Sequence, residues 1–388
     1  MTDSKMENKV KQKIMTIAIP FLILLSISGF GLILYSISKY GPASTHDSVA
    51  YMYAAESLLK GKGLVYFGYE TPFIQWPPLF PIILSGINLL GYDLVIASGY
   101  FNAFIFTLII FFSGYWLLKS TKNFAITIAG TITILISIPL IYVSRYIWSE
   151  PLFILLTLLF MISLDNYVYK SSLKFLIEGA VFASLACLTR YIGITAVITG
   201  CIILLIQNKK FINRLVETVI FGFISSVPTV LWITRNYLLS HTLIGERTPA
   251  QNTFDENIAI AFETIASWFA PCYSHSTLYI MLGLCVFVSI IIISKNFYKN
   301  TRQAGIGENM AYRISMPLIF TLVYIVYLII SASVVAFDNI NNRLLVPVYV
   351  PIIVMALFTL NDILACRNYK IGSTVITCIF AVIYTTWL

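Results

Sequence analysis

Eleven predominantly apolar stretches follow one another along the chain, and they constrain its fold more than any other feature. A helix needs about 20 such residues to span the hydrocarbon core of a membrane. Only 11% of the 388 residues are charged, whereas a soluble domain has about 25%. The chain therefore cannot expose a polar surface on all sides. This excludes a soluble enzyme, a disordered protein and a disulfide-bonded scaffold, and it predicts an all-α polytopic membrane protein.

The apolar stretches form a series of about 11 predicted transmembrane helices. Their limits are about 14–37, 93–118, 123–143, 150–168, 175–189, 191–206, 215–234, 277–294, 314–335, 344–360 and 371–388. The first follows four lysines and is too long for a cleaved signal sequence, so we expect an uncleaved anchor. Only Arg190 separates the short fifth and sixth stretches. The alternative is one long broken segment, which would reverse the orientation of everything downstream. We expect a single domain over 1–388, because no linker or repeat interrupts the series.

The distribution of basic residues predicts the orientation. With the N-terminus in the cytoplasm, 17 of the 25 Lys and Arg residues fall inside and 8 outside, in agreement with the positive-inside rule. The C-terminus then lies outside or at the outer face of the cell (inner or plasma) membrane. The net charge of +8 is therefore a topological signal, and we expect no nucleic-acid partner.

Two predicted exterior segments are long enough to carry a site, at about 39–92 and 235–277. The sequence has no C-x-x-C, no H-x-x-x-H, no P-loop and no dinucleotide fingerprint. Nucleotide-driven transport and cytoplasmic nucleotide-sugar chemistry therefore lose support. Cys272 is the only cysteine in an exterior segment, so we expect no disulfide.

The first exterior segment contains the main candidate for a catalytic residue, Asp47. It includes the runs T-H-D-S-V-A-Y-M-Y-A-A-E and, further on, W-P-P-L-F-P. We predict an interfacial amphipathic helix over 48–60 that ends at Gly61. A second short helix, opened by prolines, is predicted over 79–90. From position alone, the favoured role of Asp47 is that of a helix N-cap.

Acids and arginines recur at the exterior ends of the later predicted helices. Glu150 opens one of them, where the alternative role is a carboxylate favoured by the helix dipole. Five of the eight exterior basic residues are Arg, against four of the 17 inside. The five are Arg145, Arg190, Arg235, Arg247 and Arg343. A guanidinium can bind phosphate through two hydrogen bonds, which favours a phosphate site; snorkelling or structural ion pairs are the alternative.

A carboxylate, several arginines and an aromatic-rich rim at one membrane face suit transfer from a lipid-phosphate sugar donor. Such a donor presents its glycosidic phosphate at headgroup height, with its polyprenyl tail in the bilayer. A base must take the proton of the attacking acceptor hydroxyl, and cations must stabilise the departing phosphate. We assign Asp47 to the first role and Arg343, with Arg235 or Arg190, to the second. Direct displacement with one base would invert the anomeric centre.

Taken together, these segments resemble a known family. Asp47 with the tyrosines that follow it and the W-P-P-L run resembles the first exterior loop of GT-C fold glycosyltransferases. Among its members, the sequence resembles the protein O-mannosyltransferases and the lipid A aminoarabinose transferase. The later runs S-E-P, L-T-R-Y, W-I-T-R-N and R-L-L-V-P are similar to further signatures of the family, in the expected order. The resemblance covers residues 14–351.

By that resemblance Asp47 is the catalytic base, Glu150 is a second acid near the donor or acceptor, and the donor is a polyprenyl-phosphate monosaccharide. Many members have Asp-Glu where this chain has Asp47-Ser48, so the role of a second carboxylate passes elsewhere or is absent. Recognition of a glycan, lipid or protein acceptor would fall to 235–277. We expect no cofactor, although Asp47 and Glu150 could hold a divalent ion if they converge. Other expected substrate contacts are His46, Tyr53, Trp76, Arg145 and Arg247.

Two other functions compete with this interpretation. A lipid-linked saccharide flippase or other transporter would place charges within its spans and often contain an internal repeat. In this sequence most charges lie near predicted span ends. A polysaccharide polymerase or ligase of similar fold would be expected to have larger exterior loops.

Overall fold

Helices make up the regular structure of the protein. The computed structural model of the chain describes residues 2–68, 71–207, 209–269, 308–336 and 338–365. The helices are α1 (Thr2–Ile37), α2 (His46–Leu59), α3 (Leu79–Asn88), α4 (Leu94–Thr121), α5 (Phe124–Leu135), α6 (Ile138–Ser144), α7 (Glu150–Lys170), α8 (Leu173–Thr189), η1 (Tyr191–Gly193), α9 (Ile194–Leu205), α10 (Phe211–Ser240), α11 (Phe254–Ser267), α13 (Glu308–Val334), α14 (Asn342–Leu345), η2 (Val346–Val348) and α15 (Tyr349–Ala365). Because these ranges contain helices and no strand, the all-α prediction is confirmed. The predicted spans at 277–294 and 371–388, and Cys272, lie outside the described residues.

Six of the described helices are long and apolar enough to cross a membrane, and the bent pair α5–α6 would make a seventh. The six are Ile14–Ile37, Leu94–Thr121, Glu150–Lys170, Phe211–Ser240, Ser315–Val334 and Asn342–Asn361. The bend between α5 and α6 is 50°, and Ser137 caps α6 there. The predicted spans at 175–189 and 191–206 are also helical. With 17 residues in α8 and 12 in α9, they are shorter than the six helices named above.

Contacts at the two ends of α7 show that α8 and α9 run in opposite directions. At the N-terminal end, Glu150 pairs with Arg190, the residue after α8, at 2.7 Å. At the C-terminal end, Nζ of Lys209, which follows α9, donates to the Tyr167 hydroxyl at 2.9 Å. The chain therefore runs along α7 in α8 and returns in α9. The alternative of one long broken segment is wrong.

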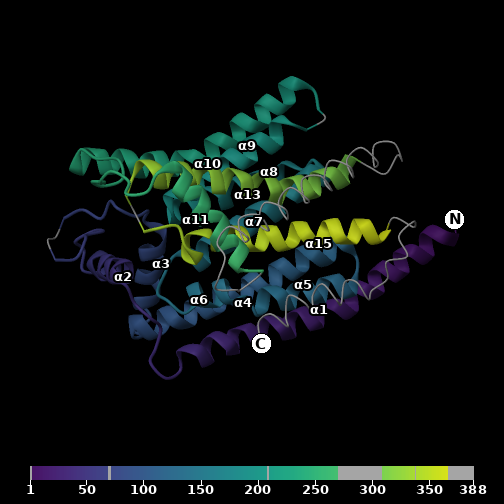
Figure 1. The fold of residues 1–388 in the computed structure, drawn as a ribbon, viewed down its shortest axis with the longest axis horizontal. Coiled ribbons are helices and arrows are strands. Elements are labelled where there is room, and N and C mark those ends of the chain that lie inside the picture. The colour runs from purple at the N-terminus through teal and green to yellow at the C-terminus, as the bar shows by residue number, and fades with distance from the viewer. Residues whose placement is uncertain (1, 69–70, 208, 270–307, 337, 366–388) are drawn as a thin grey trace.

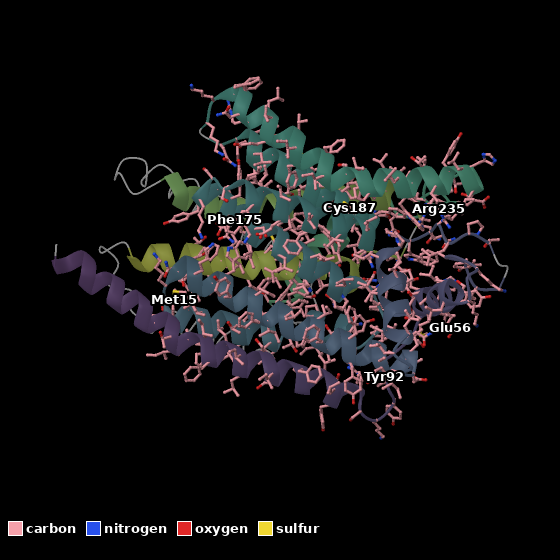
Figure 2. The ribbon with its side chains drawn as sticks, turned by 180° about the vertical axis from the view of Figure 1, so that it is seen from behind. Met15, Glu56, Tyr92, Phe175, Cys187 and Arg235 are labelled. Carbon is pink, nitrogen blue, oxygen red and sulfur yellow. The ribbon has the colours of Figure 1, made fainter. Side chains whose placement is uncertain are left out.

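The long helices follow the long axis of the molecule, and its two ends differ. Figure 1 shows α2 and α3 at one end and the N-terminus at the other. In Figure 2, Glu56, Tyr92 and Arg235 lie at the end that carries α2 and α3, whereas Met15 and Phe175 lie toward the opposite end. We call the first of these the loop end. Residues of both predicted exterior segments therefore meet at the same end of the bundle.

Local sequence signals set the position of α2 at the loop end. Thr45 is its N-cap and forms a capping box with Ser48, whose hydroxyl accepts from the Thr45 N–H at 3.0 Å. Gly61 follows the helix with a φ of +74°, a left-handed conformation that glycine adopts without strain. Asp47 lies in the first turn and is not the cap. The N-cap role predicted from position is wrong, and the Asp47 carboxylate instead contacts Arg343 of α14.

Glycines allow close packing where helices cross. A Cβ on Gly200 in α9 would lie 2.3 Å from the ring of Phe221 in α10. A Cβ on Gly114 in α4 would lie 2.5 Å from Leu22 of α1. Small residues at such crossings let helix backbones approach closely in a membrane.

We expect Gly200→Ala to destabilise the protein by about 1–3 kcal/mol, the usual effect of overpacking, because the Phe221 ring is fully buried. Gly31→Ala is the matched control, since nothing lies within 4 Å of a Cβ at Gly31 in α1. Thermal unfolding of the detergent-purified variants measures the difference. The same Tm for both variants would contradict the packing described.

Candidate active site

Arg343 lies at the centre of the candidate site. Its Nη2 donates to Oδ2 of Asp47 and its Nε to Oε1 of Glu150. Its Nη1 donates to Oδ2 of Asp338 at 3.3 Å. The guanidinium also lies over the ring of Trp148, with Cζ 4.0 Å from the centroid, a cation–π contact. Residues far apart in the sequence therefore converge on one guanidinium.

Three hydrogen bonds hold the short helix that carries Arg343. Asn341 caps α14 by accepting from the N–H of Leu344 at 3.3 Å. On one side, the indole N–H of Trp268 donates to Oδ1 of Asn342 at 2.7 Å. On the other, the hydroxyl of Tyr324 donates to the Leu344 carbonyl at 2.8 Å. These bonds fix the backbone on both sides of the guanidinium.

Glu150 is the buried anchor of this site. Its Oε1 accepts from Arg343 and also pairs with Nη1 of Arg190 at 2.7 Å. Its side chain is 1% exposed, and its Oε2 has no hydrogen-bond partner among the described residues. Arg190 reaches it because the chain is extended between α8 and η1, with φ −149° and ψ 136°. We call Asp47, Glu150, Arg190, Asp338 and Arg343 the ionic cluster.

Of the two predicted acids, Asp47 is the one that a substrate can reach. Its side chain is 21% exposed, whereas that of Glu150 is 1% exposed. Tyr51 lies one turn further along α2, where its hydroxyl is 3.3 Å from Oγ of Ser149. Burial raises the pKa of the Tyr51 phenol well above its ordinary value, and the carboxylates of Asp47 and Glu150 add to this, so Tyr51 stays neutral at physiological pH.

The start of α2 is tied to the segment before α7. The backbone N–H of Ala43 donates to the Arg145 carbonyl at 2.9 Å. The Trp148 indole N–H donates to Oγ1 of Thr45 at 2.8 Å. Buried Asn102 of α4 in turn donates to the Tyr146 carbonyl at 2.6 Å. The positions of Asp47 and Glu150 relative to each other are therefore set by direct contacts as well as by the bundle.

Aromatic side chains pack beside Asp47. Trp76 lies 5.7 Å from Tyr51 and stacks on Tyr66, with ring centroids 6.0 Å apart. Nε2 of His46 lies 2.8 Å from the Tyr66 hydroxyl. We call the whole group the aromatic cluster. Its members are His46, Tyr51, Tyr66, Phe67, Phe73 and Trp76.

Two of the predicted arginines bind backbone instead of the ionic cluster. Nη1 of Arg235 donates to the Phe73 carbonyl at 2.9 Å, and Nη2 of Arg247 donates to that of Gln75 at 3.2 Å. The hydroxyl of Tyr191 donates to the carbonyl between them, that of Ile74, at 2.8 Å. We call this set of three donors on consecutive carbonyls the carbonyl clamp. It fixes the chain directly before Trp76.

The structure thus separates the sequence-predicted site residues into groups. It brings together Asp47, Glu150, Arg190 and Arg343. His46 and Trp76 lie next to these in the aromatic cluster, and Arg235 and Arg247 belong to the carbonyl clamp. Arg145 is exposed and Tyr53 is half-buried.

Several contributors were not predicted from the sequence. Tyr51 carries a usable signal, because it lies four residues after Asp47 and so on the same helix face. Trp148 stands close to Glu150 in the sequence, but nothing local indicates that it stacks on Arg343. Tyr66 contacts the His46 side chain, and Tyr191 donates to the Ile74 carbonyl. Both partners are distant in sequence, so no local pattern predicts these contacts.

Asp47 and Glu150 converge, but on the guanidinium of Arg343. Among the described residues, no three His, Cys, Asp or Glu side chains gather as metal ligands would. Arginine side chains lie between the carboxylates, as in an ion-pair network.

Comparison with known proteins identifies the fold of the chain. No family model and no curated protein matches the chain. Solved structures of ArnT from Cupriavidus metallidurans match it. The apo form has a TM-score of 0.61 at 11% identity, and the match covers 88% of this chain. The form bound to undecaprenyl phosphate has a TM-score of 0.56 at 12% identity and covers 89%. The chain has a GT-C fold. It spans 60% of the length of each ArnT structure, and at this identity the similarity concerns the GT-C fold alone.

We expect Glu150→Gln to destabilise the protein by about 3 kcal/mol, because it leaves two largely buried guanidiniums without their shared anion. Asp47→Asn should cost less, since Asp47 is partly exposed and water can solvate the groups left behind. Thermal unfolding of both variants compares them. A larger loss for Asp47→Asn would contradict the role of Glu150 as the buried anchor.

Proposed function

We propose that the protein is an integral-membrane inverting glycosyltransferase that moves a sugar from a polyprenyl-phosphate donor to an acceptor. The observation that carries the proposal is the contact of a partly exposed carboxylate, Asp47, with the guanidinium of Arg343 at the loop end of a GT-C fold. The residue proposed as the base, Asp47, and the residue proposed to bind the phosphate, Arg343, are in direct contact there. The ArnT structure with undecaprenyl phosphate supports a polyprenyl-linked donor.

The proposed reaction is a single displacement. The acceptor oxygen forms a bond to the anomeric carbon while its proton passes to a carboxylate oxygen of Asp47. The bond from the anomeric carbon to the donor phosphate breaks, and its electron pair stays on the phosphate oxygen. Arg343 and Arg190 stabilise the charge that develops there. One base and one displacement invert the anomeric centre.

In this proposal Glu150 acts through the arginines. It is fully buried, and its Oε1 contacts both guanidiniums, so it orients Arg190 and Arg343 and does not touch substrate. The carbonyl clamp gives Arg235 and Arg247 a similar positioning role for the chain at Phe73 to Gln75. The half-exposed rings of Tyr66 and Trp76 offer apolar faces on which a sugar can pack. The acceptor would approach from the part of 235–277 that follows α10.

The layout of charge favours this proposal over a transporter. Apolar stretches such as 94–118, 151–164 and 218–234 contain no charged residue. Charged residues occur near the helix ends. The Lys119–Asp165 pair lies far from the loop end, and the ionic cluster lies at the loop end. A transporter would be expected to carry charged residues between the ends.

The proposed orientation puts the loop end outside the cell and the opposite end in the cytoplasm. We expect Glu56→Cys to react with a membrane-impermeant maleimide in intact cells, and Lys174→Cys to react only after permeabilisation. Both parent side chains are solvent-accessible, at 47% and 76% exposure, and they lie at opposite ends of the bundle. Wild-type protein gives the background from native cysteines. The reverse labelling pattern would overturn the orientation.

Asp47→Asn tests the catalytic assignment. We expect at least about a 100-fold loss of transfer when purified protein receives radiolabelled polyprenyl-phosphate sugars and a membrane extract of acceptors. Undecaprenyl phosphate should still bind, because both arginines remain. Glu56→Gln, an exposed acid on the same helix, is the matched control and should retain transfer. Full transfer by Asp47→Asn would remove Asp47 as the base.

A further inference from the structure

The ionic cluster contains one more carboxylate than guanidiniums. Asp47, Glu150 and Asp338 meet Arg190 and Arg343. Given the proposed function, a sugar-phosphate diester brings another negative charge to these two arginines. Like charges a few ångströms apart repel, so binding is favoured if one carboxylate first withdraws from the guanidinium.

Burial and bonding identify which carboxylate can withdraw. Glu150 is 1% exposed and bridges both arginines, and Asp47 is 21% exposed. Asp338 is 65% exposed and makes the longest contact of the three, 3.3 Å to Nη1 of Arg343. An exposed ion pair contributes little free energy, so the Asp338 contact is the easiest to give up.

Ala336 and Asn339, on the two sides of Asp338, make contacts of their own, so withdrawal of Asp338 needs only a side-chain rotation. The N–H of Ala336 donates to the Thr248 carbonyl at 2.8 Å. Oδ1 of Asn339 accepts from the side-chain amide of Asn252 at 3.1 Å. These bonds hold the chain on both sides of Asp338, and rotation of an exposed side chain occurs in picoseconds to nanoseconds.

We propose that Asp338 tunes the affinity of the phosphate site: it pairs with Nη1 of Arg343 when no donor is bound and gives this contact up to the donor phosphate. The same competition acts after transfer, when the lipid phosphate has become a monoester and carries up to one additional negative charge. Asp338 then competes with the product for Arg343 and promotes its release. It thus sets how tightly the spent carrier lipid is held.

Binding of undecaprenyl phosphate to the purified full chain, in nanodiscs of neutral phosphatidylcholine, tests the inference. We expect Asp338→Asn to tighten binding roughly 5- to 10-fold, the effect of one nearby charge in a partly solvated site, and the gain to shrink at high salt. Asp338→Glu keeps the charge and should bind as wild type does. Glu56→Gln, an exposed acid elsewhere at the loop end, should change binding less than twofold. Undecaprenol, which lacks the phosphate, shows binding through the lipid tail alone.

Arg343→Ala separates the failure of this inference from failure of the proposed function. If Arg343→Ala weakens binding at least 10-fold but Asp338→Asn binds no more tightly than wild type, the role of Asp338 is overturned and the donor site stands. If Asp338→Asn tightens binding equally when Arg343 is already Ala, a general charge effect replaces the competition, which also overturns it. If wild type and Arg343→Ala bind undecaprenyl phosphate equally, both the phosphate site and the role of Asp338 fail.

Discussion

The pairing of one buried carboxylate with two guanidiniums organises the loop end of this protein. A charge at a fully buried position is costly unless it is paired and hydrogen-bonded, so Glu150 requires Arg190 and Arg343 to reach it. This demand explains the extended residue between α8 and η1 and the capped helix α14. Arg343 also contacts the Asp47 carboxylate, so four separate parts of the chain meet around Glu150.

The site combines rigid and adjustable parts. Glu150 and the carbonyl clamp are held by buried or multiple contacts, whereas Asp47 and Asp338 reach the same guanidinium from more exposed positions. A guanidinium offers several donors in one plane, and each nitrogen of the Arg343 guanidinium donates to a different carboxylate. Such an arrangement keeps the cation in place while its outer partners exchange.

Much of the fold and part of the site could be predicted from the sequence. Apolar length and charge placement predict the helices at 14–37 and 150–168, and the exterior acids and arginines predict Asp47, Glu150 and Arg343. The sequence could not distinguish Arg190, which pairs with Glu150, from Arg235, which binds a carbonyl, because both stand at the end of an apolar stretch. Backbone acceptors such as the Phe73 carbonyl have no sequence signature. The role of Thr45 as N-cap was missed because Asp47 is an equally good capping residue.

The carbonyl clamp has a consequence for how substrate preference can change in this architecture. Its acceptors at Phe73, Ile74 and Gln75 are main-chain atoms, which every residue type supplies. The buried Phe73 side chain packs in the aromatic cluster, but the partly buried side chains of Ile74 and Gln75 can be exchanged while the three donors keep their bonds. Under the proposed function, a change in sugar or acceptor preference at these two positions would leave the contacts that hold the loop unchanged.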